Sequence, residues 1–171
     1  GQAVARRAKA FGMNVIYYQR TRRDKSVDTS DQCFYRPLET LLKLSDVVSI
    51  HVPLTKETYH LIGEAQLSLM KKGAYIINTA RGPVLDEEAL VRALKSDKLS
   101  GAGLDVFEKE PHIHPELLQL NNTVLTPHIG TTTLETRTAM AKMAAQNLIA
   151  ALEGKRPPNV VNPEVYKLIK N

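Results

Sequence analysis

Cysteine, tryptophan and long apolar runs are scarce or absent in this sequence of 171 residues. Cys33 is the only cysteine, which excludes a disulfide within the chain and is typical of a reducing compartment, so we expect a cytoplasmic protein. No apolar run approaches the roughly 20 residues that a membrane-spanning helix needs. No apolar stretch with a cleavage site follows the basic N-terminal residues, so we expect neither a membrane segment nor a signal peptide.

Aromatic residues are also few, and this bears on the net charge of +5. A basic cluster can bind nucleic acid, but aromatic residues make up only 5% of the chain and no nucleic-acid-binding motif accompanies the basic residues. We therefore expect no nucleic-acid partner, and a solvated basic face or a local phosphate site remain as alternatives. The basic residues before position 26 are Arg6, Arg7, Lys9, Arg20, Arg22, Arg23 and Lys25.

Strand-like and helix-like segments alternate along the chain, with no internal repeat or low-complexity tract. This alternation predicts an α/β fold with a parallel sheet. Pro37 is expected as a first helical residue and Asp86 as an N-cap, while Gly12 and Gly154 are expected to end helices. The predicted strands are 14–18, 47–52, 74–78, 100–106 and 123–126, and the predicted helices are 2–11, 37–44, 63–70, 86–96 and 132–152.

Three polar residues follow strand-like runs: Arg81 in NTARG, Glu110 in DVFEKEP and His128 in LTPHIG. Because the carboxyl ends of parallel strands border one crevice where ligands bind, we expect the three to converge. A guanidinium can hold a carboxylate and polarise a neighbouring carbonyl. An imidazole can exchange a proton with an alcohol oxygen, while a carboxylate orients the ring and favours its charged form. Each residue alone is more often a solvated loop residue, but together they predict interconversion of a 2-keto acid and a 2-hydroxy acid.

A metal site is the alternative use of the histidines. His112 and His114 have a spacing that could suit a metal, but prolines flank the pair and no cysteine or carboxylate cluster accompanies it. We therefore predict a surface turn without metal. His51 and His60 are given no functional role.

The strings NTARGPV, GAGLDVFEKEP and LTPHIG, with the N-terminal helix GQAVARRAKAFGM, resemble those of the D-isomer-specific 2-hydroxyacid dehydrogenases, and most closely the archaeal-type glyoxylate reductases in that family. The resemblance runs from Gly1 to about residue 170. It implies Arg81 as the substrate-binding arginine, Glu110 as the partner of the histidine and His128 as the acid/base. It also implies that Asp105 meets the nicotinamide carboxamide.

The same resemblance implies a Rossmann-like doubly wound parallel sheet in which Gly1 is the third glycine of the dinucleotide fingerprint. The first strand, the rest of the glycine-rich turn and the substrate domain of the family are not in this sequence. We therefore expect residues 1–154 to form a nucleotide-binding domain truncated at its N-terminus, and residues 155–171 to form an exit segment that returns toward the absent substrate domain. We expect this chain alone to bind cofactor weakly and to be inactive.

The residues after the first strand-like run indicate which dinucleotide is used. An acidic residue there would bind the ribose hydroxyls and repel a 2′-phosphate, but this chain has Gln19, Arg20, Thr21 and Arg22. Such side chains suit a 2′-phosphate, so NADPH is predicted as the preferred cofactor with NADH as the alternative, unless the segment is only a basic surface turn. The other predicted cofactor contacts are Gly1, Val52, Pro53, Thr79, Ala80, Arg81, Asp105, His128 and Gly130.

Several alternatives share this pattern. Hydroxypyruvate reductase and phosphoglycerate dehydrogenase belong to the same family, and the absent domain largely sets the size of the substrate. A corepressor branch of the fold binds dinucleotide and then partner proteins, but no nuclear targeting run or long disordered tail is present here. A third alternative is an isolated folding or dimerisation module, because the segment 132–152 carries Ala and Met on one face and could pack against a second subunit. As a partner we expect a second copy of the chain in a homodimer.

Overall fold

The structure, a computed structural model, describes residues 1–21 and 33–168. It divides into two compact units, Gly1–His128 and Ile129–Asn171. No helix among the described residues is both long and apolar enough to cross a bilayer. The elements of the first unit are α1 (Gln2–Ala10), β1 (Val15–Tyr17), β2 (Cys33–Tyr35), α3 (Leu38–Leu44), β3 (Val47–Ile50), α4 (Glu64–Leu69), β4 (Ala74–Asn78), η1 (Gly82–Val84), α5 (Glu87–Lys95), β5 (Leu99–Leu104), η2 (Leu117–Gln119) and β6 (Thr123–Leu125), and those of the second are α6 (Leu134–Leu152) and α7 (Val165–Leu168).

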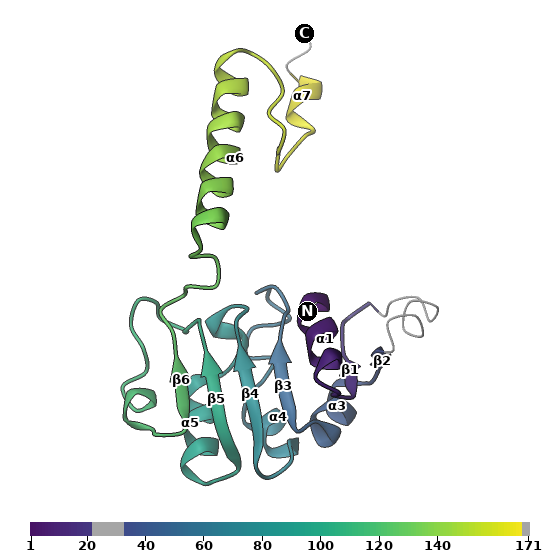
Figure 1. The fold of residues 1–171 in the computed structure, drawn as a ribbon, viewed down its shortest axis with the longest axis vertical. Helices are drawn as coiled ribbons and strands as arrows, with labels where there is room; N and C mark the ends of the chain where they lie inside the picture. Colours follow the sequence, from purple (N-terminus) through teal and green to yellow (C-terminus); the bar gives the residue numbers. More distant parts are fainter. Residues whose placement is uncertain (22–32, 169–171) are drawn as a thin grey trace. The chain divides into compact units, whose positions relative to one another are not determined.

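Four strands of the first unit form a parallel sheet in the order β3-β4-β5-β6, while β1 and β2 pair in a separate parallel sheet (Figure 1). The register of the larger sheet places Ile50, Asn78, Leu104 and Leu125 in one row. Each of these residues is the last of its strand. The loops that follow the four strands therefore all begin at one edge, which we call the carboxyl edge.

The core lies between this sheet and the helices α4 and α5, which stand behind the sheet in Figure 1. Leu67 on α4, Ile76 on β4 and Leu90 on α5 are almost fully buried in it. Helix α5 begins as the sequence predicted, because the Asp86 side chain accepts a hydrogen bond of 2.9 Å from the N–H of Ala89. The chain between β4 and β5 is thereby fixed on one side of the sheet.

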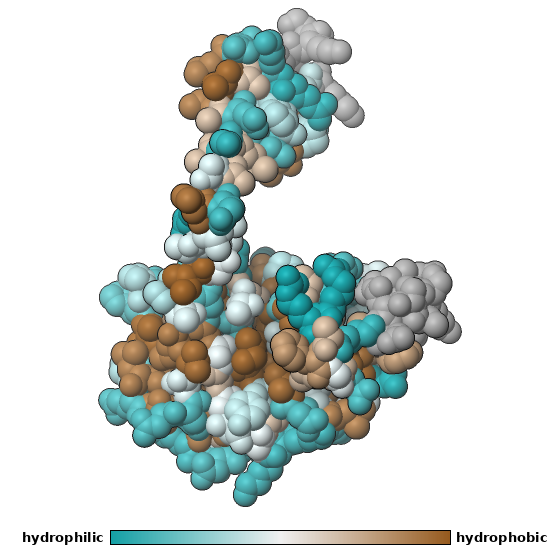
Figure 2. Space-filling model, in the orientation of Figure 1, coloured by the Kyte–Doolittle hydropathy of each residue, from teal (hydrophilic) through white to brown (hydrophobic). Residues whose placement is uncertain are grey.

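Apolar side chains also reach the surface of the first unit (Figure 2). Val47, Tyr75 and Val124 are 40%, 49% and 69% exposed, in contrast to the buried residues beside them on β3 and β4. Because successive side chains of a strand point to opposite faces, one sheet face carries the core and the other carries these exposed residues.

The expected α/β class with a parallel sheet is confirmed. The predicted strands agree with β1 and β3 to β6, and the five predicted helices with α1, α3, α4, α5 and α6, apart from one or two terminal residues in most cases. Three details differ from the expectation. Pro37 is the N-cap of α3 rather than its first helical residue. The strand β2 was not predicted, and neither was the short helix α7 within the exit segment 155–171.

Candidate active site

The turn that carries Arg81 is held by the buried side chain of Asn78, which is only 1% exposed. Its amide nitrogen donates to the carbonyl of Arg81 and its amide oxygen accepts from the N–H of Ala80, both at 3.0 Å. One buried amide thus satisfies two backbone groups of the turn, as buried polar groups require. The exposed guanidinium of Arg81 donates through Nη1 to the Ala80 carbonyl at 2.6 Å.

Gly82 lets this turn lie directly against the loop after β5. A Cβ at Gly82 would lie 1.9 Å from the carbonyl carbon and oxygen of Phe107 and 2.4 Å from the nitrogen of Glu108. Any side chain at this position would therefore collide with a peptide unit. The close approach brings the Arg81 turn beside the segment that leads to Glu110.

Asp105 directly follows β5 and hydrogen-bonds to residues at the ends of β4 and β6. Its N–H donates to the carbonyl of Asn78 at 3.0 Å, and its carboxylate accepts a hydrogen bond of 2.6 Å from the hydroxyl of Thr126. The N–H of Thr126 in turn donates to the carbonyl of Leu104 at 2.9 Å. The side chain of Asp105, which is 8% exposed as a residue, is consequently fixed between the ends of β4 and β6.

His128 and Glu110 form a hydrogen-bonded pair at the carboxyl edge. His128 Nδ1 lies 2.8 Å from Glu110 Oε2, and the N–H of Phe107 donates to Glu110 Oε1 at 3.0 Å. The histidine has φ +53°, in the left-handed region that few residues other than glycine adopt, and its N–H donates to the Thr126 carbonyl at 3.0 Å. Because Nδ1 faces the carboxylate, Nε2 is the ring nitrogen that remains to face a substrate.

Electrostatics links this pair to Arg81. The hydrogen bond with His128 lowers the pKa of Glu110, and burial partly offsets this. The hydrogen bond from the Phe107 N–H and the charges of His128 and Arg81 lower the pKa further. The side chains of His128 and Glu110 are 48% and 37% exposed, so a small molecule can reach them. The structure therefore brings the three residues predicted to be catalytic to the same edge of the sheet.

Four of the predicted cofactor residues lie beside the same edge: Gly1, Pro53, Thr79 and Ala80. Gly1 starts α1 and packs against His51, the residue after β3, because a Cβ on Gly1 would lie 3.4 Å from that of His51. The carbonyl of Pro53 accepts a hydrogen bond of 2.6 Å from the Thr58 hydroxyl. Thr79 is exposed and Ala80 is half-buried in the turn before Arg81.

The segment after β1 is described only in part. Gln19 Nε2 donates to the carbonyl of Thr21 at 2.5 Å, and Arg20 is exposed. The pKa of Glu57 is lowered mainly by its hydrogen bond with Thr55, and the charge of Arg20 is a smaller contribution. The predicted contact Arg22 lies outside the described residues, and Gly130 belongs to the second unit.

Several supporting residues were missed by sequence reasoning. Asn78, Gly82 and Thr126 all lie within the three quoted strings, so their proximity to the catalytic candidates was a signal that could have found them. The predicted surface histidine His114 is bonded to Glu88, with Nε2 3.1 Å from Oε1. Within residues 1–21 and 33–168, no group of three or more His, Cys, Asp or Glu side chains is arranged to hold a metal ion.

Comparison with known proteins places this architecture in a family. Residues 1–130 match the family described as D-isomer specific 2-hydroxyacid dehydrogenase, NAD binding domain. The chain is 56% identical over 165 residues to a glyoxylate reductase of Thermococcus litoralis, covering 96% of this chain and 50% of that protein.

Solved structures agree with this match. The TT0316 protein of Thermus thermophilus superposes with a TM-score of 0.87 at 50% identity, covering 94% of this chain and 50% of that one. An NADPH-dependent glyoxylate/hydroxypyruvate reductase of Sinorhizobium meliloti, solved with NADP and malonate, gives 0.81 at 37% identity, covering 88% and 46%. The chain spans about half the length of the curated relatives that it matches. It belongs to the D-isomer specific 2-hydroxyacid dehydrogenase family.

Proposed function

We propose that this chain supplies the nucleotide-binding and catalytic part of a glyoxylate/hydroxypyruvate reductase, which reduces a 2-keto acid to a D-2-hydroxy acid and prefers NADPH. The observation that carries the proposal is the pair of His128 Nδ1 and Glu110 Oε2 at 2.8 Å, with the charge of Arg81 within electrostatic reach. A cation, a carboxylate and a titratable ring beside one sheet edge match the needs of keto-acid reduction. The name of the Thermococcus litoralis relative supports the same reaction.

Each protein group has a defined task in this reaction. When bound, the reduced nicotinamide supplies a hydride to the carbonyl carbon of the substrate. Arg81 binds the substrate carboxylate and the neighbouring carbonyl oxygen, which fixes the orientation of the reacting carbon. Protonated His128 donates a proton from Nε2 to the carbonyl oxygen as negative charge develops there. Glu110 holds Nδ1, which keeps the ring oriented and stabilises its charged form.

The residues at the start of α1 and after β1 support the proposal of a dinucleotide with a 2′-phosphate. The backbone N–H groups at the start of α1 can donate to a pyrophosphate, because the first N–H groups of a helix have no partner within it. Arg20 and Thr21 follow β1, where an acidic residue would disfavour NADPH. The charge of Arg20 makes the smallest contribution to the lowered pKa of Glu57, in the loop after β3, so Arg20 lies within electrostatic range of that loop. Asp105, whose carboxylate is held by the hydroxyl of Thr126, would accept a hydrogen bond from the carboxamide.

The test is a substrate and cofactor matrix with the full-length enzyme that contains this chain. Glyoxylate and hydroxypyruvate are each supplied with NADPH and with NADH, and the configuration of the product from hydroxypyruvate is determined. We expect reduction of at least one of the two acids, a higher kcat/KM with NADPH and a product of D configuration. Failure to reduce either acid with either cofactor would contradict the proposal, and turnover of a phosphorylated hydroxy acid instead would favour a phosphoglycerate dehydrogenase.

We further propose that the 171-residue chain alone binds NADPH weakly and turns over little. It spans only about half the length of its relatives. Titration of the purified chain with NADPH, followed by protein fluorescence and by activity, tests this. Submicromolar binding with normal turnover would refute it.

The assembly and location of the enzyme complete the proposal. We propose a cytoplasmic homodimer, supported by the single cysteine of the chain and by the Ala- and Met-containing helix α6. Size-exclusion chromatography with light scattering should give twice the mass of the full-length chain. A monomeric mass at micromolar concentration would contradict the dimer.

A further inference from the structure

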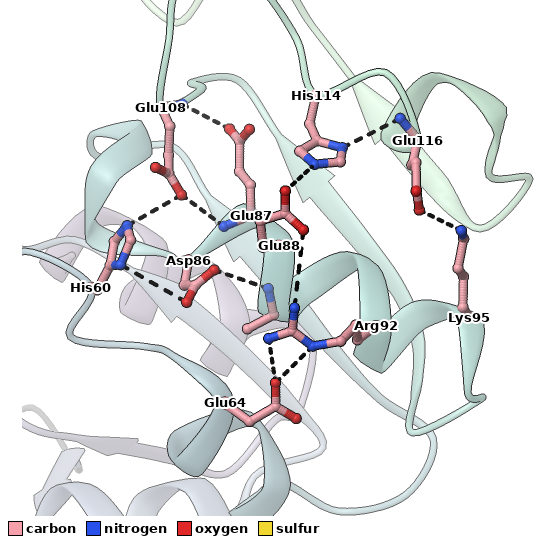
Figure 3. A network of polar contacts seen from close by, with 11 residues as sticks. His60, Glu64, Asp86, Glu87, Glu88, Arg92, Lys95, Glu108, His114 and Glu116 are labelled. Carbon is pink, nitrogen blue, oxygen red and sulfur yellow. Dashed lines mark hydrogen bonds and ion pairs between the residues drawn. The ribbon is translucent and has the colours of Figure 1, made fainter.

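The loop that carries Glu110 rests on a network of carboxylates that the proposed reaction does not use (Figure 3). Glu87 is the first residue of α5, and Glu108 lies two positions before Glu110. The residue Glu87 is 7% exposed and the side chain of Glu108 is 18% exposed. Both carboxylates are thus removed from water, which is costly unless they accept hydrogen bonds.

Glu87 and Glu108 hold each other through two reciprocal hydrogen bonds. The N–H of Glu108 donates to Glu87 Oε1 at 2.7 Å, and the N–H of Glu87 donates to Glu108 Oε1 at 2.8 Å. Figure 3 shows the two side chains crossing between α5 and the loop. Because each residue supplies one donor and one acceptor, the pair fixes both the distance and the orientation of the loop relative to the helix.

The peptide between Phe107 and Glu108 is therefore held from two directions. Its N–H is bound by Glu87, and its carbonyl group lies in the space that a side chain at Gly82 would fill. The next N–H upstream, that of Phe107, donates to Glu110 Oε1. A shift of this peptide would move the donor that orients the carboxylate of Glu110 toward His128.

Other charged groups surround the pair. His60 Nε2 lies 3.2 Å from Glu108 Oε1, but the geometry of this contact is not that of a hydrogen bond. His60 Nδ1 lies 3.9 Å from Asp86 Oδ2. The N–H of His60 donates to the carbonyl of Pro83, in the segment after Arg81. Burial raises the pKa of Glu87, and the charge of Glu108 raises it further. The hydrogen bond from the Glu108 N–H and the charges of His114 and Lys109 lower it.

We infer that Glu87 is a positioning residue for the acid/base pair: its carboxylate holds the Phe107–Glu108 peptide so that Glu110 faces His128. The inference rests on the reductase proposed above. It assigns no contact with substrate or cofactor to Glu87, whose effect passes through Glu108, Phe107 and Glu110.

Three substitutions in the full-length enzyme separate the hydrogen bond from the charge. Glu87→Ala removes the acceptor of the Glu108 N–H. Glu87→Gln keeps an oxygen at the same reach without the charge, so it should behave like the wild type. Glu87→Asp keeps the charge but withdraws the oxygen by one methylene, and it replaces the alanine variant if that variant does not fold.

The matched control is Glu88→Ala. Glu88 is the next residue of α5, but its side chain is 72% exposed and bonds to the ring of His114, not to the Phe107–Glu108 peptide. A change that appears in Glu87→Ala and not in Glu88→Ala cannot come from loss of a negative charge at the start of the helix.

The first readout does not depend on activity. With ¹³C-labelled glutamate carboxyl groups, the resonance assigned to Glu110 by its loss in Glu110→Gln is titrated with pH. In the wild type Glu110 should titrate below an ordinary glutamate, in agreement with its lowered pKa. In Glu87→Ala and Glu87→Asp its midpoint should move back toward the ordinary value, whereas in Glu87→Gln and Glu88→Ala it should stay in place.

The second readout is the reductase itself. A misplacement on the order of 1 Å can cost about 10²-fold in rate, so Glu87→Ala should lose about tenfold to a hundredfold in kcat with little change in KM. The pH profile of kcat should also change, because the hydrogen bond between Glu110 and His128 is then displaced. In Glu87→Gln both kcat and the pH profile should stay as in the wild type.

A folded Glu87→Ala or Glu87→Asp enzyme with an unchanged Glu110 titration and an unchanged pH profile would overturn the inference, even if the variant were less stable. A wild-type enzyme that reduces no 2-keto acid would instead refute the proposed function. In that case the carboxyl titration still decides whether Glu87 positions Glu110.

Discussion

Gly82→Ala is the substitution whose consequence follows most directly from the structure. The added methyl group would lie 1.9 Å from two backbone atoms of Phe107. Those atoms belong to a peptide unit, so no side-chain rotation can relieve the overlap. The two loops would have to separate by about 1.5 Å to reach a tight but tolerated contact of 3.4 Å.

This separation would act directly on the proposed chemistry. Arg81 adjoins Gly82 on one side of the contact, and Glu110 follows Phe107 on the other. Since a misplacement of about 1 Å can cost about 10²-fold, kcat/KM for the keto acid should fall by about 10²-fold or more. Overpacking typically costs about 1–3 kcal/mol, so the free energy of unfolding should also fall.

Gly63→Ala is the matched control for this experiment. Gly63 is buried as well, but its nearest neighbours would lie 3.7–3.9 Å from an added Cβ, which is ordinary contact. It caps α4, so the change should cost roughly 1 kcal/mol or less and leave the kinetics unaltered. Steady-state assays and urea unfolding of both variants provide the comparison. A Gly82→Ala enzyme within threefold of wild-type kcat/KM would show that the contact between Gly82 and the Phe107–Glu108 peptide does not position the catalytic groups.

Three further predictions concern the site itself. His128→Ala should lower kcat by about 10²–10⁴-fold, the usual contribution of an acid/base group, and a loss below tenfold in steady-state assays would count against its role. The pKa of Glu110 is lower in the folded protein than in the unfolded chain. Its ionised carboxylate therefore stabilises the folded state at any pH above the ordinary glutamate pKa, and this stabilisation is lost as the pH falls through the pKa of Glu110 in the folded protein. The stability deficit of Glu110→Gln in urea should therefore shrink in acid, and a deficit independent of pH would contradict this. Arg20→Ala should reduce the ratio of kcat/KM for NADPH to that for NADH, and an unchanged ratio would remove Arg20 from the 2′-phosphate site.

The parts of the fold that were predicted correctly are those with a strong local signal. Helix α5 has an N-cap at Asp86 and a regular apolar face, and the central strands are apolar runs bounded by turns. At β2 the apolar run is limited to Cys33–Tyr35, between Gln32 and Arg36, whereas the runs that predicted β1 and β6 are five and four residues long. Pro37 fits both the N-cap and the first turn of a helix, so its sequence signal could not distinguish the two positions.

The site was predictable to the extent that its residues follow strands. Parallel strands of one sheet end at a common edge, so Arg81, Glu110 and His128 could be expected together before any distance was known. The hydrogen bonds between Glu87 and Glu108, which position the Glu110 loop, could not be expected in this way. Glu87 and Glu108 are 21 positions apart, and in sequence both are ordinary charged residues near a helix start or a loop. Only the folded backbone shows that each accepts the other's N–H.

In this structure the Glu110–His128 pair already has the arrangement that the reaction needs, whereas the Arg81 guanidinium must change its hydrogen bonds when substrate binds. Both carboxylate oxygens of Glu110 have partners, in Phe107 and His128, so the acid/base pair needs no rearrangement before reaction. The guanidinium of Arg81, in contrast, donates to the neutral carbonyl of Ala80. A substrate carboxylate accepts stronger, charge-assisted bonds than a neutral carbonyl and should draw Arg81 away from it. Changes at Arg81 should therefore appear in KM as well as in kcat, whereas changes in the residues that position Glu110 should appear mainly in kcat and its pH dependence.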